Sequence, residues 1–140
     1  MPTPLLPANN GVATLAHVSY SVSDLARSLA FYAALGFSEV NPRRESAGEG
    51  TKVFLGPLGA DVFGTQFELL WSHDEHRLER GTAHRHVALR SADFDGTLER
   101  LAALGIKPQA APTRVEAGSP RICLVEDPDG YGIELIEAER

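Results

Sequence analysis

Two histidines and two glutamates are spaced along the chain in a way that could supply four metal ligands. They occur in the order His17, Glu68, His86 and Glu134, with separations of 51, 18 and 48 residues. Imidazole nitrogen and carboxylate oxygen are acceptable ligands for nickel, zinc, cobalt, manganese and iron. Four such ligands leave two positions of an octahedral ion for water or substrate, whereas a closed structural zinc site leaves none. The sequence therefore predicts an open site for a divalent metal ion.

The four residues occupy matching places in an internal repeat. Residues 17–37 and 86–106 align without a gap at an offset of 69, and eight of the 21 positions are identical. Residues 67–70 (Phe-Glu-Leu-Leu) likewise correspond to residues 133–136 (Ile-Glu-Leu-Ile). Each half begins with a histidine and ends with a glutamate. Such self-similarity indicates two copies of one structural unit.

The first half has the pattern of strand, helix and three further strands. Alternation of polar and apolar residues predicts the first strand. Asp24 is suited to cap the helix that follows, and Gly36 is suited to end it in a left-handed conformation. The expected elements are a strand over 12–22, a helix over 25–35, a strand over 37–40, a mobile polar loop over 41–50, and strands over 51–55 and 66–72.

The second half repeats this plan. Asp93 takes the place of the first cap, Gly105 ends the helix, and residues 127–130 (Asp-Pro-Asp-Gly) suit a type I turn. The expected elements are a strand over 84–90, a helix over 94–104, a strand near 106–110, and strands over 121–126 and 131–137. We predict one α+β domain over 1–140, made of tandem βαβββ modules 12–72 and 84–137 that a charged linker, 73–83, joins.

Strand parity places the ligand candidates away from the helices. Successive side chains on a strand point to opposite faces. Phe67 and Leu69 therefore lie opposite Glu68, and Ile133 lies opposite Glu134. If the strongly apolar face packs on the helix, each histidine and glutamate shares the other face of its sheet.

Other titratable residues have simpler interpretations. His73 and His76 fall in the charged linker and are expected to be solvated, whereas His84 could take a pocket role beside His86. Cys123 lies in an apolar strand and is expected to be an inert core residue. As the one cysteine in the chain, it rules out an internal disulfide, which favours a reducing, cytoplasmic compartment.

Composition excludes several other classes of protein. The chain has 140 residues, of which 43% are hydrophobic, and a formal net charge of −6 from 13 basic and 19 acidic side chains. An acidic chain without a basic run is not a general nucleic-acid binder. The longest apolar stretch, 29–37, is too short to cross a bilayer, and residues 1–7 lack the features of a secretory signal. We therefore expect neither a nucleic-acid nor a membrane partner.

The sequence resembles the vicinal oxygen chelate superfamily, the glyoxalase, bleomycin-resistance and dioxygenase fold, and within it the bacterial glyoxalase I enzymes. The resemblance covers residues 13–137 and preserves the ligand order His, Glu, His, Glu. It implies curved mixed sheets around a cup-shaped metal site that is completed in a homodimer. The segments that carry it are 15–17, 24–37, 67–70, 81–89 and 125–137.

The resemblance also implies a reaction. Family enzymes of this kind are divalent-metal-dependent lyases or isomerases that bind a small molecule through two vicinal oxygens and move a proton through an enediolate. Carried over by position, Glu134 is the general base, Glu68 is its partner on the other face of the substrate, and all four ligand candidates hold the metal.

The expected thiol-binding residues depart from the family pattern. Glyoxalase I enzymes commonly hold glutathione with an arginine four residues after the first histidine and an asparagine four residues after the first glutamate. Here these positions are Ser21 and Ser72, which can bind substrate through hydrogen bonds only, while Arg90 offers a cation four residues after His86. Glutathione, another thiol cosubstrate and a free hydroxy-ketone all stay open.

Three alternatives share the fold. An epimerase of a hydroxy-ketone or sugar-like substrate would use the same four ligands. An Fe(II) dioxygenase needs two histidines and one carboxylate, so four ligands argue against it. A metal-free drug-binding or resistance protein would place aromatic residues such as Phe54 and Trp71 in the cup.

Overall fold

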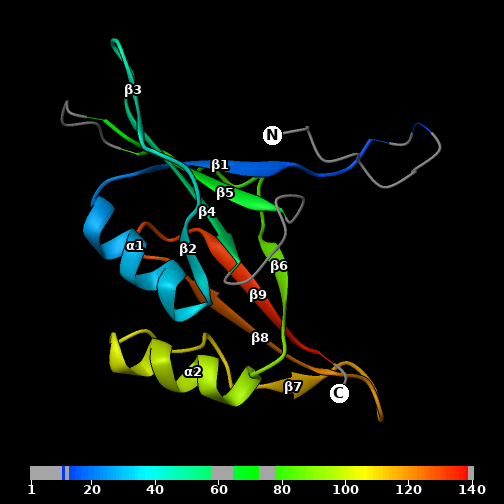
Figure 1. Cartoon of the computed structure of the whole chain (residues 1–140). Coiled ribbons are helices and arrows are strands. Elements are labelled where there is room, and N and C mark those ends of the chain that lie inside the picture. Colours follow the sequence, from blue (N-terminus) through cyan, green and yellow to red (C-terminus); the bar gives the residue numbers. More distant parts are fainter. Residues whose placement is uncertain (1–10, 12, 58–64, 73–77, 139–140) are drawn as a thin grey trace.

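Two mixed sheets and two helices make up the structure (Figure 1). The computed structural model describes residues 11, 13–57, 65–72 and 78–138. The first half contains β1 (His17–Val22), α1 (Leu25–Ala34), β2 (Phe37–Glu39), β3 (Arg44–Ser46), β4 (Gly50–Pro57) and β5 (Gln66–Trp71). The second half contains β6 (Val87–Ser91), α2 (Phe94–Ala103), β7 (Thr113–Arg114), β8 (Arg121–Glu126) and β9 (Gly132–Glu137).

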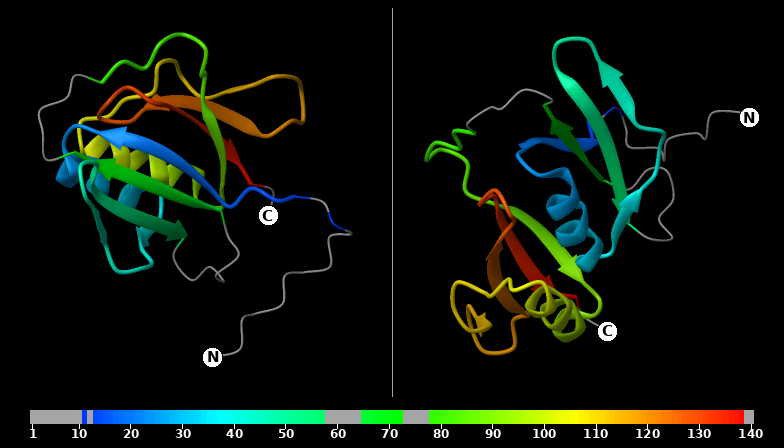
Figure 2. Two further views of the ribbon diagram at one scale, coloured as in Figure 1. Left: turned by 90° about the horizontal axis from the view of Figure 1, so that it is seen from above. Right: turned by 90° about the vertical axis from the view of Figure 1, so that its left-hand side faces the viewer.

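The two sheets have equivalent topologies. In the first sheet the order is β1-β5-β4-β2, with β3 also paired to β4, and in the second it is β6-β9-β8-β7. The strand that precedes each helix runs parallel to the last strand of its own half, β1 with β5 and β6 with β9. The remaining pairs are antiparallel. The predicted α+β class and the repeated plan are thus confirmed, and Figure 2 shows the two sheets from two further directions.

Local capping positions each helix as the sequence predicts. The Asp24 side chain accepts a hydrogen bond from the backbone N–H of Arg27 at 3.1 Å, and Asp93 accepts one from Gly96 at 3.2 Å. Gly36 follows α1 with a φ of +94°, a left-handed conformation that glycine adopts without steric cost. Each helix therefore begins and ends within one residue of its expected limits.

The prediction of a mobile loop over residues 41–50 is wrong. Residues Arg44–Ser46 form β3, an antiparallel partner of β4 that extends well beyond the rest of the sheet in Figure 1. The polar residues and glycines of this segment form the turn of a hairpin, in which the Glu49 N–H donates to the Ser46 carbonyl at 3.1 Å. Gly50 has a φ of +121° and packs so closely on Trp71 that a Cβ atom would lie 2.1 Å from its carbonyl oxygen.

The other large differences in strand limits are at three places. No strand forms near 106–110, where Pro108 supplies no N–H donor for a ladder, and β7 begins instead at Thr113, directly after Pro112. The first strand begins at His17 rather than at residue 12, and β6 begins at Val87 rather than at residue 84. Residues 73–77 of the expected linker lie outside the described part of the chain.

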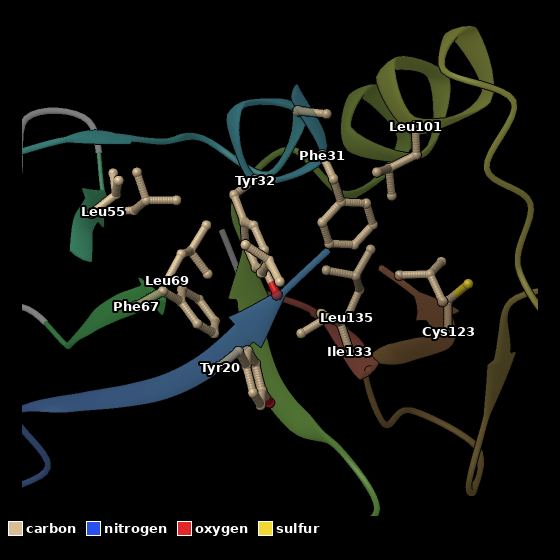
Figure 3. Close-up of a cluster of buried hydrophobic side chains, with 14 of the residues drawn as sticks. Tyr20, Phe31, Tyr32, Leu55, Phe67, Leu69, Leu101, Cys123, Ile133 and Leu135 are labelled. Carbon is tan, nitrogen blue, oxygen red and sulfur yellow. The ribbon is translucent and has the colours of Figure 1, made fainter. Parts of the chain in front are cut away.

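One hydrophobic core joins the two halves (Figure 3). Its members come from both sheets and both helices, and α1 contacts α2 directly. Tyr32 of α1 is fully buried and lies 4.8 Å, centroid to centroid, from the ring of Phe67 on β5. Its hydroxyl donates to Asp127, at the turn between β8 and β9, at 3.0 Å. The core therefore lies on the helix side of each sheet, and the predicted ligands lie on the opposite face of each sheet.

Candidate metal centre

The first histidine–glutamate pair lies on the face of the first sheet that points away from the helices and the core, called here the open face. His17 on β1 and Glu68 on β5 bring Nε2 and Oε2 to 3.2 Å. Phe67 and Leu69, the neighbours of Glu68, are 2% and 0% exposed, so alternation along β5 turns the carboxylate away from the core. The ring of Phe54 on β4 meets the His17 ring edge-on, with the centroids 5.8 Å apart.

The second pair repeats this arrangement on the other sheet. His86, immediately before β6, and Glu134 on β9 bring Nε2 and Oε2 to the same 3.2 Å. Ile133 and Leu135, which flank Glu134, are 0% and 1% exposed. Both pairs thus arise from the same local cause, which is a strand whose alternate residues enter the core.

The geometry of each pair fits two ligands of one divalent ion. Donors about 2.1 Å from a shared ion and at right angles to one another lie about 3.0 Å apart. The observed separations are close to this value and involve one nitrogen and one oxygen donor in each pair. Within the described residues, however, no three His, Cys, Asp or Glu side chains come together in a group that could hold a metal ion. Each half of the chain therefore contributes one histidine–glutamate pair, and the two pairs do not meet within the described residues.

The three expected substrate-binding residues lie on, or directly after, strands of the two sheets that carry these pairs. Ser21 is exposed on β1, on the same face as His17, and its carbonyl accepts a hydrogen bond from the Tyr131 hydroxyl at 2.8 Å. Ser72 follows β5, and its backbone packs against Gly50. Arg90 is exposed on β6, two residues beyond Ala88, which lies opposite Glu134 in the parallel pair.

His84 joins the two halves rather than the ligand pairs. Its Nε2 lies 3.2 Å from the hydroxyl of Tyr20 on β1. Tyr20 in turn stacks on Tyr131, with ring centroids 4.2 Å apart. These rings line a hollow between the halves, and burial raises the pKa of Tyr20 to about 12, so its hydroxyl stays protonated at neutral pH. Cys123 is 4% exposed, as expected for a core residue, and burial raises its pKa.

The sequence predicts only a turn at Asp127 and does not indicate the second role of its side chain. The turn is present, with the Gly130 N–H donating to the Asp127 carbonyl at 2.9 Å. The side chain is also 4% exposed and accepts hydrogen bonds from the Tyr32 hydroxyl and from the backbone N–H groups of Asp129 and Tyr131. Burial raises the pKa of Asp127, while these donors lower it. No local signal in the sequence pairs residue 32 with residue 127.

Comparison with known proteins defines the family. A family model described as Glyoxalase/Bleomycin resistance protein/Dioxygenase superfamily matches residues 14–135. The chain therefore belongs to this superfamily, which is also called the vicinal oxygen chelate superfamily, as the motifs predict.

Curated relatives of similar length are enzymes. A lactoylglutathione lyase of Haemophilus influenzae is 36% identical over 124 residues, which cover 86% of this chain and 90% of the relative. A probable lactoylglutathione lyase of Vibrio cholerae is 33% identical over 122 residues, which cover 86% of this chain and 88% of the relative. The match thus extends over nearly the whole of both proteins.

A solved structure supports the fold. Glyoxalase I from Zea mays superimposes with a TM-score of 0.78 at 30% identity and covers 90% of this chain. The chain spans 45% of that structure, so the maize protein is about twice as long. Separately, no helix among the described residues is long and apolar enough to cross a membrane.

Proposed function

We propose that this chain is a divalent-metal-dependent lyase or isomerase of the glyoxalase I type. The observation that carries the proposal is the pair of matched histidine–glutamate contacts, each 3.2 Å long and each on the open face of its sheet. The relatives named as lactoylglutathione lyases support the same reaction class. A bound divalent ion would polarise two oxygens on adjacent carbons of a small substrate. The C–H proton on one of these carbons would then be easier to remove.

The protein's own residues have distinct roles in this proposal. His17, Glu68 and His86 hold the ion, and Glu134 acts as a ligand and as the general base that moves a proton between adjacent carbons. Glu68 faces the reacting carbons from the other side. Ser21, Ser72 and Arg90 would contact the remainder of the substrate.

The complete site is proposed to form between two copies of the chain. Each half contributes two ligands, and no larger group forms within the described residues. An isologous dimer can place the first sheet of one copy against the second sheet of its partner, which produces two equivalent four-ligand sites. The partition into modules 12–72 and 84–137, and a cytoplasmic location, also remain proposals.

Complementation between inactive chains tests the shared site. In a mixed dimer of His17→Ala and Glu134→Gln chains, one site carries both substitutions and the other carries neither. Random association of equal amounts should restore about one quarter of the wild-type sites. Each variant alone should be inactive. Absence of any rescue, with mixed dimers demonstrated by mass spectrometry, would show that each site lies within one chain.

Metal content tests the function itself. The protein, purified without chelators or an affinity-tag metal, should hold about one divalent ion per chain by elemental mass spectrometry. Hemithioacetals of methylglyoxal with glutathione and with simpler thiols should then be assayed, because Ser21 and Ser72 supply no charge for glutathione. A protein that takes up none of nickel, zinc, cobalt or manganese is not such an enzyme, and a metal-free drug-binding function would replace the proposal.

A further inference from the structure

The two carboxylates of the proposed site have unequal surroundings, although the repeat places them at equivalent positions. In the parallel pair β1–β5, Ser19 lies directly opposite Glu68. In the equivalent pair β6–β9, Ala88 lies directly opposite Glu134. The internal repeat therefore keeps the ligands but changes the residue that faces each glutamate from a hydroxyl donor to a methyl group.

The contacts of Glu68 show the consequence. The Ser19 hydroxyl donates to Oε1 of Glu68 at 3.2 Å, while Oε2 of the same carboxylate lies 3.2 Å from Nε2 of His17. Phe54 pairs with Glu68 across the antiparallel β4–β5 ladder, where it packs against the edge of the His17 ring. Both oxygens of Glu68 thus have a partner, and the side chain is 14% exposed.

Glu134 is held by fewer groups. Its Oε2 lies 3.2 Å from Nε2 of His86, and the side chain is 24% exposed. Leu124 faces it across the β8–β9 ladder and offers no hydrogen bond. Among the described residues, Oε1 of Glu134 has no donor equivalent to Ser19. Rotation of the Glu134 carboxylate about its terminal torsion therefore breaks fewer contacts than the same rotation of the Glu68 carboxylate.

We propose that Ser19 is a positioning residue that holds Glu68 as the fixed ligand of the site, while Glu134, which lacks such a donor, is the carboxylate free to reorient. The inference rests on the metal site of the proposed function. A hydrogen bond to the second oxygen of a ligating carboxylate sets its orientation before the ion binds. Loss of the Ser19 hydroxyl should therefore weaken metal binding without disturbing the fold, because Ser19 is exposed.

The first experiment measures the affinity of the full-length protein for Co²⁺ alone, by chelator competition and by the visible absorption of the bound ion. Ser19→Ala should weaken binding by about 10-fold to 100-fold, the range typical of residues that orient metal ligands. Ser19→Thr retains the hydroxyl on a strand and should restore binding. Ser21→Ala is the matched control, since it removes a hydroxyl from the same strand and the same face.

The second experiment installs the missing donor. Ala88→Ser should strengthen Co²⁺ binding by several-fold, because a hydroxyl at that position would face Glu134 as Ser19 faces Glu68. The same variant should lower kcat more than it changes KM, because a restrained carboxylate is slower to act as a base. Unchanged affinity and kcat in Ala88→Ser would refute the claim that the missing hydroxyl makes the two halves unequal.

The outcomes separate this inference from the proposed function. A wild-type protein that binds no Co²⁺ removes the metal-dependent function and the role of Ser19 with it. Normal binding by the wild type together with equal binding by Ser19→Ala overturns the role of Ser19 alone. A loss in Ser19→Ala that Ser19→Thr does not restore, or that Ser21→Ala shares, also overturns it, since the hydroxyl contact with Glu68 would not be the cause.

Discussion

Replacement of Tyr32 by phenylalanine should destabilise the protein by removing a buried hydrogen bond between its two halves. The Tyr32 hydroxyl donates to Oδ2 of Asp127 at 3.0 Å, and the two residues are 0% and 4% exposed. The other oxygen, Oδ1, accepts two backbone N–H groups at 2.9 Å, whereas among the described residues Tyr32 is the one partner of Oδ2. Tyr32→Phe therefore leaves a buried carboxylate oxygen without a donor.

The size of the effect follows from the charge of the acceptor. Hydrogen bonds to charged groups contribute about 1.5–3 kcal/mol, and an unsatisfied buried acceptor places this variant at the upper end, about 2–3 kcal/mol. For a chain of this length the melting temperature should fall by roughly 6–10 °C. Urea denaturation at neutral pH, followed by circular dichroism, measures the free energy of unfolding.

Tyr131→Phe is the matched control. It removes the same hydroxyl from a partly exposed tyrosine that donates to a neutral acceptor, the carbonyl of Ser21, at 2.8 Å. Its expected cost is about 0.5–1.5 kcal/mol. In an Asp127→Asn background the cost of Tyr32→Phe should also shrink, since the charged acceptor is gone. If Tyr32→Phe costs no more than Tyr131→Phe, the bond to Asp127 is not a significant link between the halves.

The pH dependence provides a further check on the same bond. The Tyr32 hydroxyl lowers the pKa of Asp127, although burial raises it overall, so Tyr32→Phe should raise the pKa further. The difference in unfolding free energy between wild type and variant should thus be full at neutral pH and diminish as acid protonates Asp127. A difference that grows in acid would contradict this account.

Three further predictions concern the site and the surface. Metal added at about 100 times its dissociation constant should stabilise the wild type by about 2.7 kcal/mol, whereas His86→Ala should show little of this gain in a thermal-shift titration; an equal gain would remove His86 from the ligands. Glu134→Gln should keep much of its metal but lose at least about 100-fold in kcat, and full activity would exclude Glu134 as the base. Hydrogen bonds from Arg121 lower the pKa of Glu137, so its contribution to stability is present above its ordinary value of 4.5 and is lost as the pH falls below it. Glu137→Gln should therefore lose less unfolding free energy than the wild type as the pH falls. If the two proteins lose the same amount in acid denaturation, Glu137 does not make this contribution.

Much of the fold was predictable because its signals are local. The offset of 69 residues between the two halves is a property of the sequence alone, and it predicts two similar units. Asp24 and Gly36 act within one helical turn of the ends of α1, so their types indicate its limits directly. Alternation along β5 and β9 likewise sets which face carries each glutamate, since it depends only on strand parity.

The errors lie where non-local pairing competes with local composition. Residues 44–46 look like part of a polar loop, yet they gain backbone partners on β4 and so form a strand. The prediction of a strand near 106–110 extends the repeat into a segment that Pro108 interrupts. A repeat in sequence therefore predicts the shared core of the two units better than their edges.

The sequence by itself determined the four ligand candidates, their order and the faces on which they lie, because residue type and strand parity are encoded locally. Only the tertiary structure decided that His17 and Glu68 meet at one sheet while His86 and Glu134 meet at another, since these contacts require β1 to pair with β5 and β6 to pair with β9. It also decided that Ser19 contacts one carboxylate and that, among the described residues, no equivalent hydroxyl contacts the other. Those relations depend on distances between residues far apart in the chain, which spacing alone does not specify.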